Sequence, residues 1–266
     1  MRTRAITGLF FVIVLVGSVV WGSISFSLFF LFISLASLHE FYRMIKTADI
    51  KPNYLGGLIF SGSLFILLML FELEKISMKA FYGIVPLFTI LFIVELYRKH
   101  ERPFINIAYT FFGFIFSVLP FMFFYELGFL EGVYNYQYPL GFLILLWASD
   151  TGAYLSGKTW GKHKLFERHS PKKTWEGFAG GLIISAFSAF LISQFYQGLN
   201  TWQWLVSSLI IVIFGTYGDL VESMLKRSYH VKDSGTILPG HGGLLDRFDG
   251  LLLSAPLVYI FLALCS

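Results

Sequence analysis

The chain has 266 residues, of which 56% are hydrophobic and only 14% are charged, and its mean hydropathy is +0.70. A soluble domain carries roughly 25% charged residues and could not bury this much apolar surface, so the composition excludes a water-soluble enzyme and predicts a protein that uses lipid as its solvent. The formal net charge of +4 is modest, and the single cysteine, Cys265, cannot form an internal disulfide.

Nine segments are apolar over about 17 residues or more, the length that crosses the hydrocarbon core of a bilayer. The first follows Arg2 and Arg4 as a signal peptide would, but it lacks a small-residue cleavage site, so we interpret it as a retained anchor. The expected fold is an all-α integral membrane protein with about nine transmembrane helices. The segments are 5–22, 24–42, 54–71, 80–97, 105–126, 138–157, 176–196, 202–223 and 249–265.

Lysine and arginine residues gather in alternate loops. Eighteen of the twenty lie at the N-terminus or after the second, fourth, sixth and eighth segments, and only Lys75 and Lys79 lie on the other side. The positive-inside rule therefore predicts a cytoplasmic N-terminus and an external C-terminus, which an odd number of helices satisfies. This orientation puts the ends of the sixth and eighth segments and the start of the ninth at the cytoplasmic face.

The eighth segment carries four polar side chains on one face. Asp219, Glu222, Ser223 and Lys226 follow the spacing i, i+3, i+4 and i+7 of a helix. An unpaired aspartate inside a bilayer costs at least ~2.5 kcal/mol, so Asp219 needs a partner. One interpretation is a buried ion pair with Lys226 or Arg227, and the other is a bound metal ion.

Further acids favour the metal. Asp246 and Asp249 lie at the expected start of the ninth segment, at the same cytoplasmic level as Asp150 and Asp219. Carboxylates that converge from separate elements are the hard oxygen ligands that Mg²⁺ prefers. For Asp249, and less so for Asp246, a helix cap remains an alternative.

Two loops between these segments are candidates for anion binding. The run PGHGG at 239–243 can bring backbone N–H groups close to an anion, although His241 fits an ordinary loop hydrogen bond equally well. The loop after the sixth segment holds six cations, whose default role at a membrane is to contact anionic headgroups. Asp150 on the same inner face and the second basic loop favour a substrate site instead.

Other polar residues have simpler interpretations. His39, Glu40 and Glu95 lie near cytoplasmic helix ends and are expected to reach water. Gly177 and Gly181 form a small-xxx-small pair, which indicates close helix packing rather than chemistry.

The stretch from Ser223 to Asp249 resembles the pattern of the phosphatidate cytidylyltransferases, the CDP-diacylglycerol synthases. It carries SMLKR, KDSG and PGHGGLLDRFD in that order, and DTGAY at 150–154 and SPKKTWEG at 170–177 are similar to the same family. The resemblance covers residues 145–250, approximately. It implies that CTP and phosphatidic acid react to give CDP-diacylglycerol and pyrophosphate with Mg²⁺, a second cation being open.

The resemblance also implies roles for individual residues. The cations would offset the charge of two anionic substrates, and the attacking lipid phosphate is already ionised, so no strong general base is needed. Catalytic roles are expected for Asp219, Asp246, Lys226 and Arg247. The metal ligands would be Asp219, Asp246 and Asp249. Substrate contacts are expected for Asp150, Ser170, Lys172, Lys173, Ser223, Arg227, Lys232, Asp233, His241, Gly242 and Gly243.

We expect residues 1–137 to form an N-terminal transmembrane bundle and residues 138–266 to form the catalytic region with its cytoplasmic loops. The expected location is the cell membrane, with the active site facing the cytoplasm. Expected partners are CTP, phosphatidic acid and membrane lipid, without nucleic acid, and a homodimer is open.

Three other functions share parts of this pattern. A CTP-dependent polyisoprenol-type lipid kinase would need the same metal and basic loops but would transfer the γ-phosphate to a hydroxyl. A secondary transporter would place its site near the bilayer midplane, away from helix ends. A CDP-alcohol phosphotransferase is set aside, because residues 246–250 give its D-x-x-D-G opening but the later aspartate pair is missing.

Overall fold

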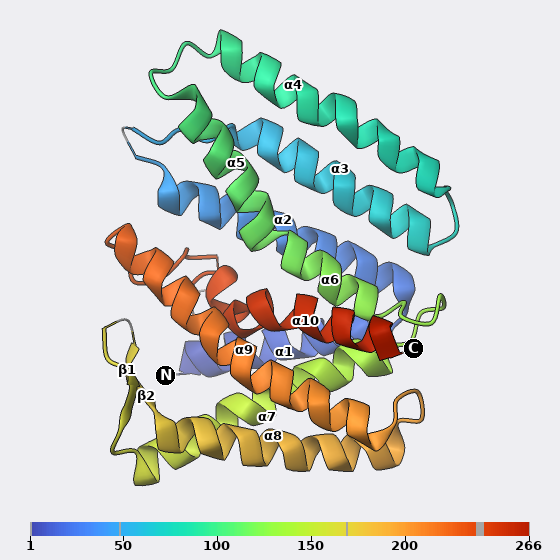
Figure 1. Cartoon of the computed structure of the whole chain (residues 1–266), viewed down its shortest axis with the longest axis vertical. Coiled ribbons are helices and arrows are strands. Elements are labelled where there is room, and N and C mark those ends of the chain that lie inside the picture. The colour runs from blue at the N-terminus through green and yellow to red at the C-terminus, as the bar shows by residue number, and fades with distance from the viewer. Residues whose placement is uncertain (1, 48, 169, 238–241, 266) are drawn as a thin grey trace. The chain divides into compact units, whose positions relative to one another are not determined.

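The computed structural model describes residues 2–47, 49–168, 170–237 and 242–265, and they are predominantly helical (Figure 1). The chain divides into two compact units. Unit 1 comprises Met1–Tyr125 with Asp233–Asp246, and unit 2 comprises Glu126–Lys232 with Arg247–Ser266. The expected division into an N-terminal bundle and a catalytic region concerns function and stays a prediction.

Unit 1 is built on helix α2. Its helices are α1 (Arg2–Val20), α2 (Ser23–Ile45), α3 (Tyr54–Glu72), the 3-10 helix η1 (Met78–Gly83), α4 (Ile84–Tyr97), α5 (Pro103–Ser117) and α6 (Leu119–Leu127), the last ending at the unit boundary. The core is aromatic: Tyr125 stacks on Phe26 with ring centroids 5.4 Å apart, and its hydroxyl lies 3.0 Å from Ser27 Oγ. The stacked rings and the buried hydroxyl pair fix α6 against α2.

Unit 2 contains four α-helices and a small hairpin. Its elements are α7 (Gln137–Trp160), β1 (Lys164–Phe166), β2 (Ser170–Thr174), α8 (Trp175–Phe195), α9 (Thr201–Ser228) and α10 (Asp249–Cys265), with the 3-10 helix η2 (Leu245–Arg247) at the unit boundary. Strands β1 and β2 are antiparallel, with Lys164 opposite Thr174 and Phe166 opposite Ser170. This hairpin departs from the all-α expectation. The short, charged loop gave no alternating apolar pattern from which a strand could be predicted.

Helices α7 and α8 lie side by side in unit 2 (Figure 1) because small residues line their contact. A Cβ added to Gly177 would lie 2.9 Å from the Ala153 carbonyl oxygen, and one on Gly181 would lie 3.0 Å from that of Ser149. Backbone atoms cannot move aside as a flexible side chain can. The small-xxx-small pair therefore acts in packing, as expected.

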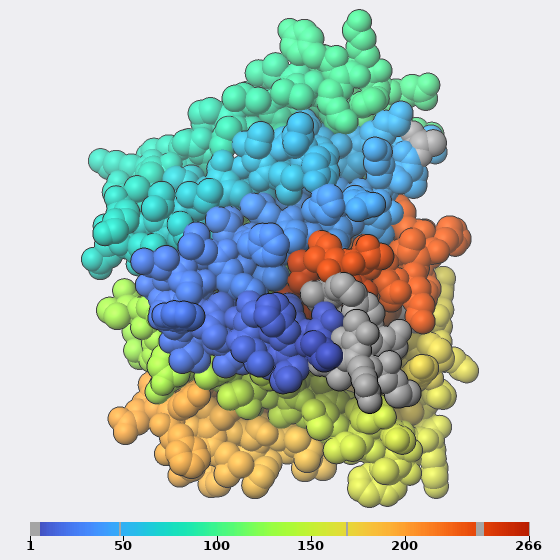
Figure 2. Space-filling model, turned by 180° about the vertical axis from the view of Figure 1, so that it is seen from behind, coloured from blue at the N-terminus to red at the C-terminus, as the bar shows by residue number. Residues whose placement is uncertain are grey.

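Six of the described helical stretches are long and apolar enough to cross a membrane: Ser23–Ile45, Tyr54–Glu72, Met78–Tyr97, Pro103–Leu127, Trp175–Phe195 and Thr201–Ser228. Ile6–Val20 and Asp249–Cys265 are shorter apolar helices, and α7 coincides with the remaining expected segment. Within α4 only Leu91 and Glu95 are buried, and Figure 2 shows α4 beside α3 on the outside of unit 1. An outer surface this apolar is suited to lipid. The chain is a helical, multi-pass membrane protein.

Candidate active site

An acidic cluster in unit 2 brings together side chains from three helices. Asp219 and Glu222 of α9 and Asp249, the first residue of α10, each offer a carboxylate oxygen, and the three oxygens lie within 4.8 Å of one another. Asp150 of α7 interacts electrostatically with both Asp219 and Asp249. Acids separated by as much as 99 positions in the sequence therefore meet at one place.

The close approach of α9 and α10 puts Asp249 beside Asp219. A Cβ on Gly218 would overlap the carbonyl oxygen of Asp249, and one on Gly215 would lie 3.4 Å from the carbonyl oxygen of Gly250. The carbonyl oxygen of Asp249 is a backbone atom and cannot rotate away from a side chain at position 218, whereas the distance at position 215 is an ordinary contact. Glycine at position 218 is what allows the two helices to meet at this distance.

Asp219 is paired with a lysine from the hairpin. Lys173 Nζ lies 2.6 Å from Asp219 Oδ2 and 3.4 Å from the carbonyl oxygen of Thr216. Lys172 is exposed, whereas the side chain of Lys173 is only 26% exposed and reaches Asp219. The ion-pair interpretation named Lys226 or Arg227 as the partner of Asp219, and the structure assigns Lys173 instead.

Thr174, the last residue of β2, anchors this strand to helix α8. Thr174 is buried and caps α8, its Oγ1 accepting a hydrogen bond of 3.1 Å from the Gly177 N–H. At the other side of the hairpin, Glu176 accepts hydrogen bonds from the N–H groups of Lys162 and His163. These bonds tie both ends of the loop to the first turn of α8, which positions Lys173.

The polar face of α9 is confirmed. Ser223 Oγ donates to Asp219 Oδ1 at 3.2 Å, and Lys226 Nζ lies 2.5 Å from Oε2 of the fully buried Glu222. Arg227 is exposed and donates to the carbonyl oxygen of Val231 at 3.0 Å. The helix therefore delivers two acids, one hydroxyl and one lysine to the same side.

The charges of the cluster do not cancel. Four carboxyl groups, on Asp150, Asp219, Glu222 and Asp249, accompany two ammonium groups, on Lys173 and Lys226, so the formal charge of these described groups is −2 when all are ionised. Like charges this close repel one another, and the repulsion is strongest at the fully buried Glu222. A divalent cation with a preference for oxygen ligands matches both the excess charge and the donor atoms, so the residues present fit Mg²⁺.

Asp246 lies in unit 1 and organises its own loop. Its Oδ2 accepts hydrogen bonds from the N–H groups of Ser234 (2.9 Å) and Gly243 (2.8 Å). Gly242 has φ = 82°, and a Cβ there would lie 2.7 Å from Asp246 Oδ2. The glycine pair thus lets the backbone wrap around this carboxylate.

Glu40 of α2 is a residue that the sequence interpretation missed. It is 2% exposed, and its Oε2 accepts hydrogen bonds from Ser234 Oγ (3.2 Å) and the Leu245 N–H (3.0 Å). A Cβ on Gly235 or Gly243 would overlap its carboxyl group. Glu40 therefore fastens both sides of the loop that carries Asp246.

The expectation that Glu40 and Glu95 reach water was wrong. Glu95 is 1% exposed, and it binds Arg98 Nη1 at 2.6 Å and Asn106 Nδ2 at 2.8 Å. The usable signal was the position of each acid inside an otherwise apolar segment. Such a residue needs a partner, because water does not reach it there.

A model of the cytidylyltransferase family matches residues 2–265 of the chain. The chain belongs to this family. It is 37% identical over 275 residues to the phosphatidate cytidylyltransferase of Bacillus subtilis (strain 168), which covers 100% of this chain and 99% of that protein. The enzymes of the same name from Staphylococcus aureus (strain COL) and Staphylococcus epidermidis (strain ATCC 12228 / FDA PCI 1200) are 36% and 34% identical, each over 98% of this chain and 99% of the relative. The family resemblance read from the motifs is confirmed.

The remaining expected site residues of this cytidylyltransferase lie as follows. Ser170 begins β2 and is partly exposed, whereas Lys232, Asp233 and Arg247 are exposed. His241 lies outside the described residues. Asp246 and Asp219 belong to different compact units, so their sharing of one ion stays a prediction.

Proposed function

We propose that the chain is a phosphatidate cytidylyltransferase, which joins CTP and phosphatidic acid to give CDP-diacylglycerol and pyrophosphate. The observation that carries the proposal is the cluster of Asp150, Asp219, Glu222 and Asp249 with Lys173, found in a chain whose full-length relatives bear that name. Such a cluster binds metal and phosphate together, and both are needed to handle a nucleoside triphosphate.

Asp219 and Asp249 would hold Mg²⁺ together with Glu222, and we propose Asp246 as a further ligand. The ion, when bound, supplies positive charge to the phosphate oxygens of CTP. We expect Mg²⁺ to raise the melting temperature of the purified protein, because a ligand that binds only the folded state stabilises it. The Asp219→Asn variant should lose this rise. A rise of equal size in that variant would remove Asp219 from the metal site.

The chain's own groups would act by positioning and charge compensation. The phosphate monoester of the lipid has a second pKa of about 6, so its oxygen is ionised at neutral pH and can attack without a general base. A new bond forms from that oxygen to the α-phosphorus while the bond to the β-phosphate breaks, and pyrophosphate leaves with the electron pair. Lys173 and Lys226, with the exposed cations Lys172, Arg227 and Arg247, would offset the charge that builds up between the two substrates.

We also propose the orientation that the basic loops favour. The chain would cross the cell membrane nine times, with a cytoplasmic N-terminus and an external C-terminus. The ends of α7 and α9 and the start of α10 would then share the cytoplasmic level, where CTP is available.

A labelling experiment tests the reaction. Membranes that contain the protein are given Mg²⁺, phosphatidic acid and CTP with radioactive phosphorus at either the α- or the γ-position. We expect lipid label only from α-labelled CTP. Label that passes only from the γ-position to a polyisoprenol would instead support a kinase, and the absence of any labelled lipid with any acceptor would favour transport.

A further inference from the structure

A hollow of about 580 Å³ lies in unit 1, where α2 ends and α3 begins. Its volume falls in the range of about 300–1,000 Å³ that small-molecule sites occupy. All its lining residues belong to unit 1, and none has been assigned above to substrate or metal. They are His39, Tyr42, Arg43, Lys46, Arg98 and the run from Lys51 to Leu55.

The charged side chains that line this hollow are all positive. Its lining holds four cationic side chains and no carboxylate. Arg98 is engaged by Glu95, whereas Arg43, Lys46 and Lys51 are exposed and form no ion pair within the described part of the chain. Cations held around one concave surface attract an anion far better than cations spread over a convex one.

A buried amide in the wall points to a hydrogen-bond acceptor. Asn53 is 9% exposed, and its Oδ1 accepts the Gly56 N–H at 3.1 Å, which caps α3. Its backbone N–H donates to Thr110 Oγ1 at 2.8 Å, so the residue is held at both ends. The Nδ2 group has no hydrogen-bond partner among the described residues. A buried donor of this kind is normally satisfied, and Asn53 is part of the lining of the hollow.

Two further features suit an anion. The N-terminus of α3 begins at Tyr54, directly after Asn53, and a helix N-terminus carries partial positive charge. The Tyr54 hydroxyl lies 2.5 Å from His39 Nδ1 and supplies another polar group to the lining. The hollow is therefore lined by four cationic side chains, by Asn53 and by the first residues of α3.

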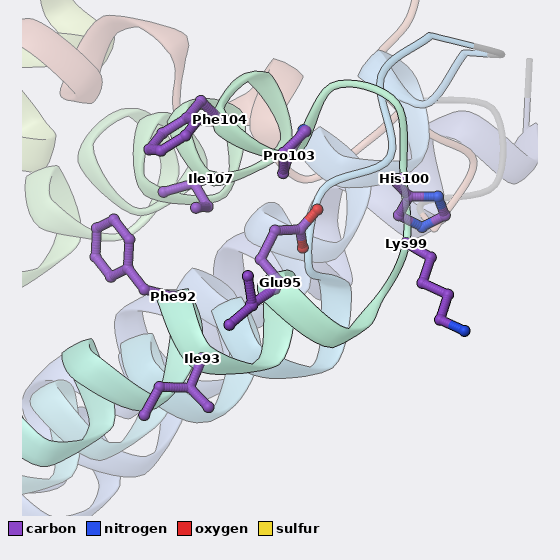
Figure 3. A pocket seen from close by; sticks show the side chains of 9 residues that line it. Phe92, Ile93, Glu95, Lys99, His100, Pro103, Phe104 and Ile107 are labelled. Atoms are coloured by element: carbon purple, nitrogen blue, oxygen red, sulfur yellow. The ribbon is translucent and has the colours of Figure 1, made fainter.

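A second hollow in unit 1 differs in its apolar wall, in its carboxylate and in having, among the residues described, no buried donor without a partner. It measures about 340 Å³ and lies between α4 and α5, where Phe92, Phe104 and Ile107 form an apolar wall (Figure 3). Its carboxylate, on Glu95, is already bound by Arg98 and Asn106. It offers no buried donor without a partner among its described lining.

We propose that the hollow between α2 and α3 binds a phosphate group, presented by the headgroup of an anionic membrane lipid. Both helices are candidate membrane spans, so their shared end lies at the membrane surface, where such headgroups are found. Leu55, which is exposed at the edge of the hollow, would contact the apolar part of the lipid. Free phosphate has the same chemistry, and the experiment separates the two sources.

The test compares two pairs of lysines. The full-length protein is placed in phosphatidylcholine nanodiscs with added phosphatidylglycerol, and the lipid retained after detergent extraction is counted by native mass spectrometry. The double variant Lys46→Gln/Lys51→Gln should lower phosphatidylglycerol affinity, by about fivefold for each lysine removed. The double variant Lys75→Gln/Lys79→Gln removes the same charge elsewhere in unit 1 and should bind as the wild type does. Equal losses in the two pairs, or no loss in either, would overturn the proposal.

Asn53→Asp gives a second, sharper variant. Aspartate keeps the cap of α3 but replaces the unpartnered donor by a negative charge, so the helix should remain while lipid retention falls. Unchanged retention would contradict the proposal. Competition by inorganic phosphate alone would assign the hollow to a free anion and overturn the lipid assignment. The assay needs neither CTP nor turnover, so its result is independent of the proposed cytidylyl transfer.

Discussion

At the residue scale, the ion pair between Lys173 and Asp219 compensates part of the negative charge of the acidic cluster. The two side chains are both partly exposed, at 26% and 32%, so the pair is open to a substrate as well as to its partner. A lysine in this position can pass from the carboxylate to a phosphate as the substrate arrives, whereas Lys226 is held by the fully buried Glu222.

Replacing Lys173 by methionine should lower cytidylyl transfer by about 10²–10³-fold, the usual effect of removing one group that stabilises developing charge. The reason is that the cluster loses one of its two compensating cations. Lys172→Met is the matched control, because its side chain points outward, and it should cost far less. The label-transfer assay compares the activities of the two variants. Equal losses of activity would show that any lysine near the site serves and that the contact of Lys173 with Asp219 has no special role.

Glu40 can be tested against another buried acid. Glu40→Ala removes the acceptor for Ser234 Oγ and the Leu245 N–H, so the loop around Asp246 should open and activity should fall at least about tenfold, since small displacements of catalytic groups are costly. Glu40→Gln keeps one acceptor oxygen and should retain more activity.

Hydrogen exchange separates a local effect of Glu40 from general damage. Residues 233–246 should exchange faster in Glu40→Ala, because their amides lose a buried anchor. Glu95→Ala, which breaks the contacts with Arg98 and Asn106, should leave exchange in 233–246 unchanged. Faster exchange of residues 233–246 in both Glu40→Ala and Glu95→Ala would show that Glu40 does not stabilise this loop specifically.

At the element scale, the short distance between α9 and α10 depends on a glycine, Gly218, at their contact. Gly218 faces the carbonyl oxygen of Asp249, and α9 must pass this point to bring Asp219 next to Asp249. The helices themselves were predictable from apolar length, but their closest approach was not. Any of the chain's 25 glycines could have served packing or flexibility.

Gly218→Ala should therefore push the start of α10 away from α9 and lower activity by about 10²-fold, the effect expected of a displacement near 1 Å at a catalytic group. Gly83→Ala is the control, since a Cβ there meets nothing within 4 Å. Activity and thermal stability are measured for both. Wild-type activity in Gly218→Ala would show that the two carboxylates need not stay this close.

At the scale of the whole molecule, a single cysteine can report on which side of the membrane the C-terminus lies. Cys265 is exposed and is the single cysteine of the sequence, at the end of α10. In the proposed orientation, with nine crossings and a cytoplasmic N-terminus, it would lie outside the cell. A membrane-impermeant maleimide should label it in intact cells, and Cys265→Ser should abolish the signal. Labelling only after the cells are opened would contradict the external C-terminus.

The positions of the helices, the basic loops and the family were determined by the sequence alone. Apolar length, charge and motif spacing are properties of contiguous residues, so the nine expected segments coincide with helices and the polar face of Asp219, Glu222, Ser223 and Lys226 is present. These features need no knowledge of what lies across the fold.

Only the tertiary structure decided which side chains meet. Lys173 rather than Lys226 pairs with Asp219, and Glu40 in α2 binds a loop 194 to 205 positions later in the chain. Such partnerships depend on how separate elements pack, which is set by shape at contacts such as Gly218 with Asp249. A local sequence pattern does not reveal how the helices pack, because each lysine or acid has the same chemistry whichever partner it contacts in the fold.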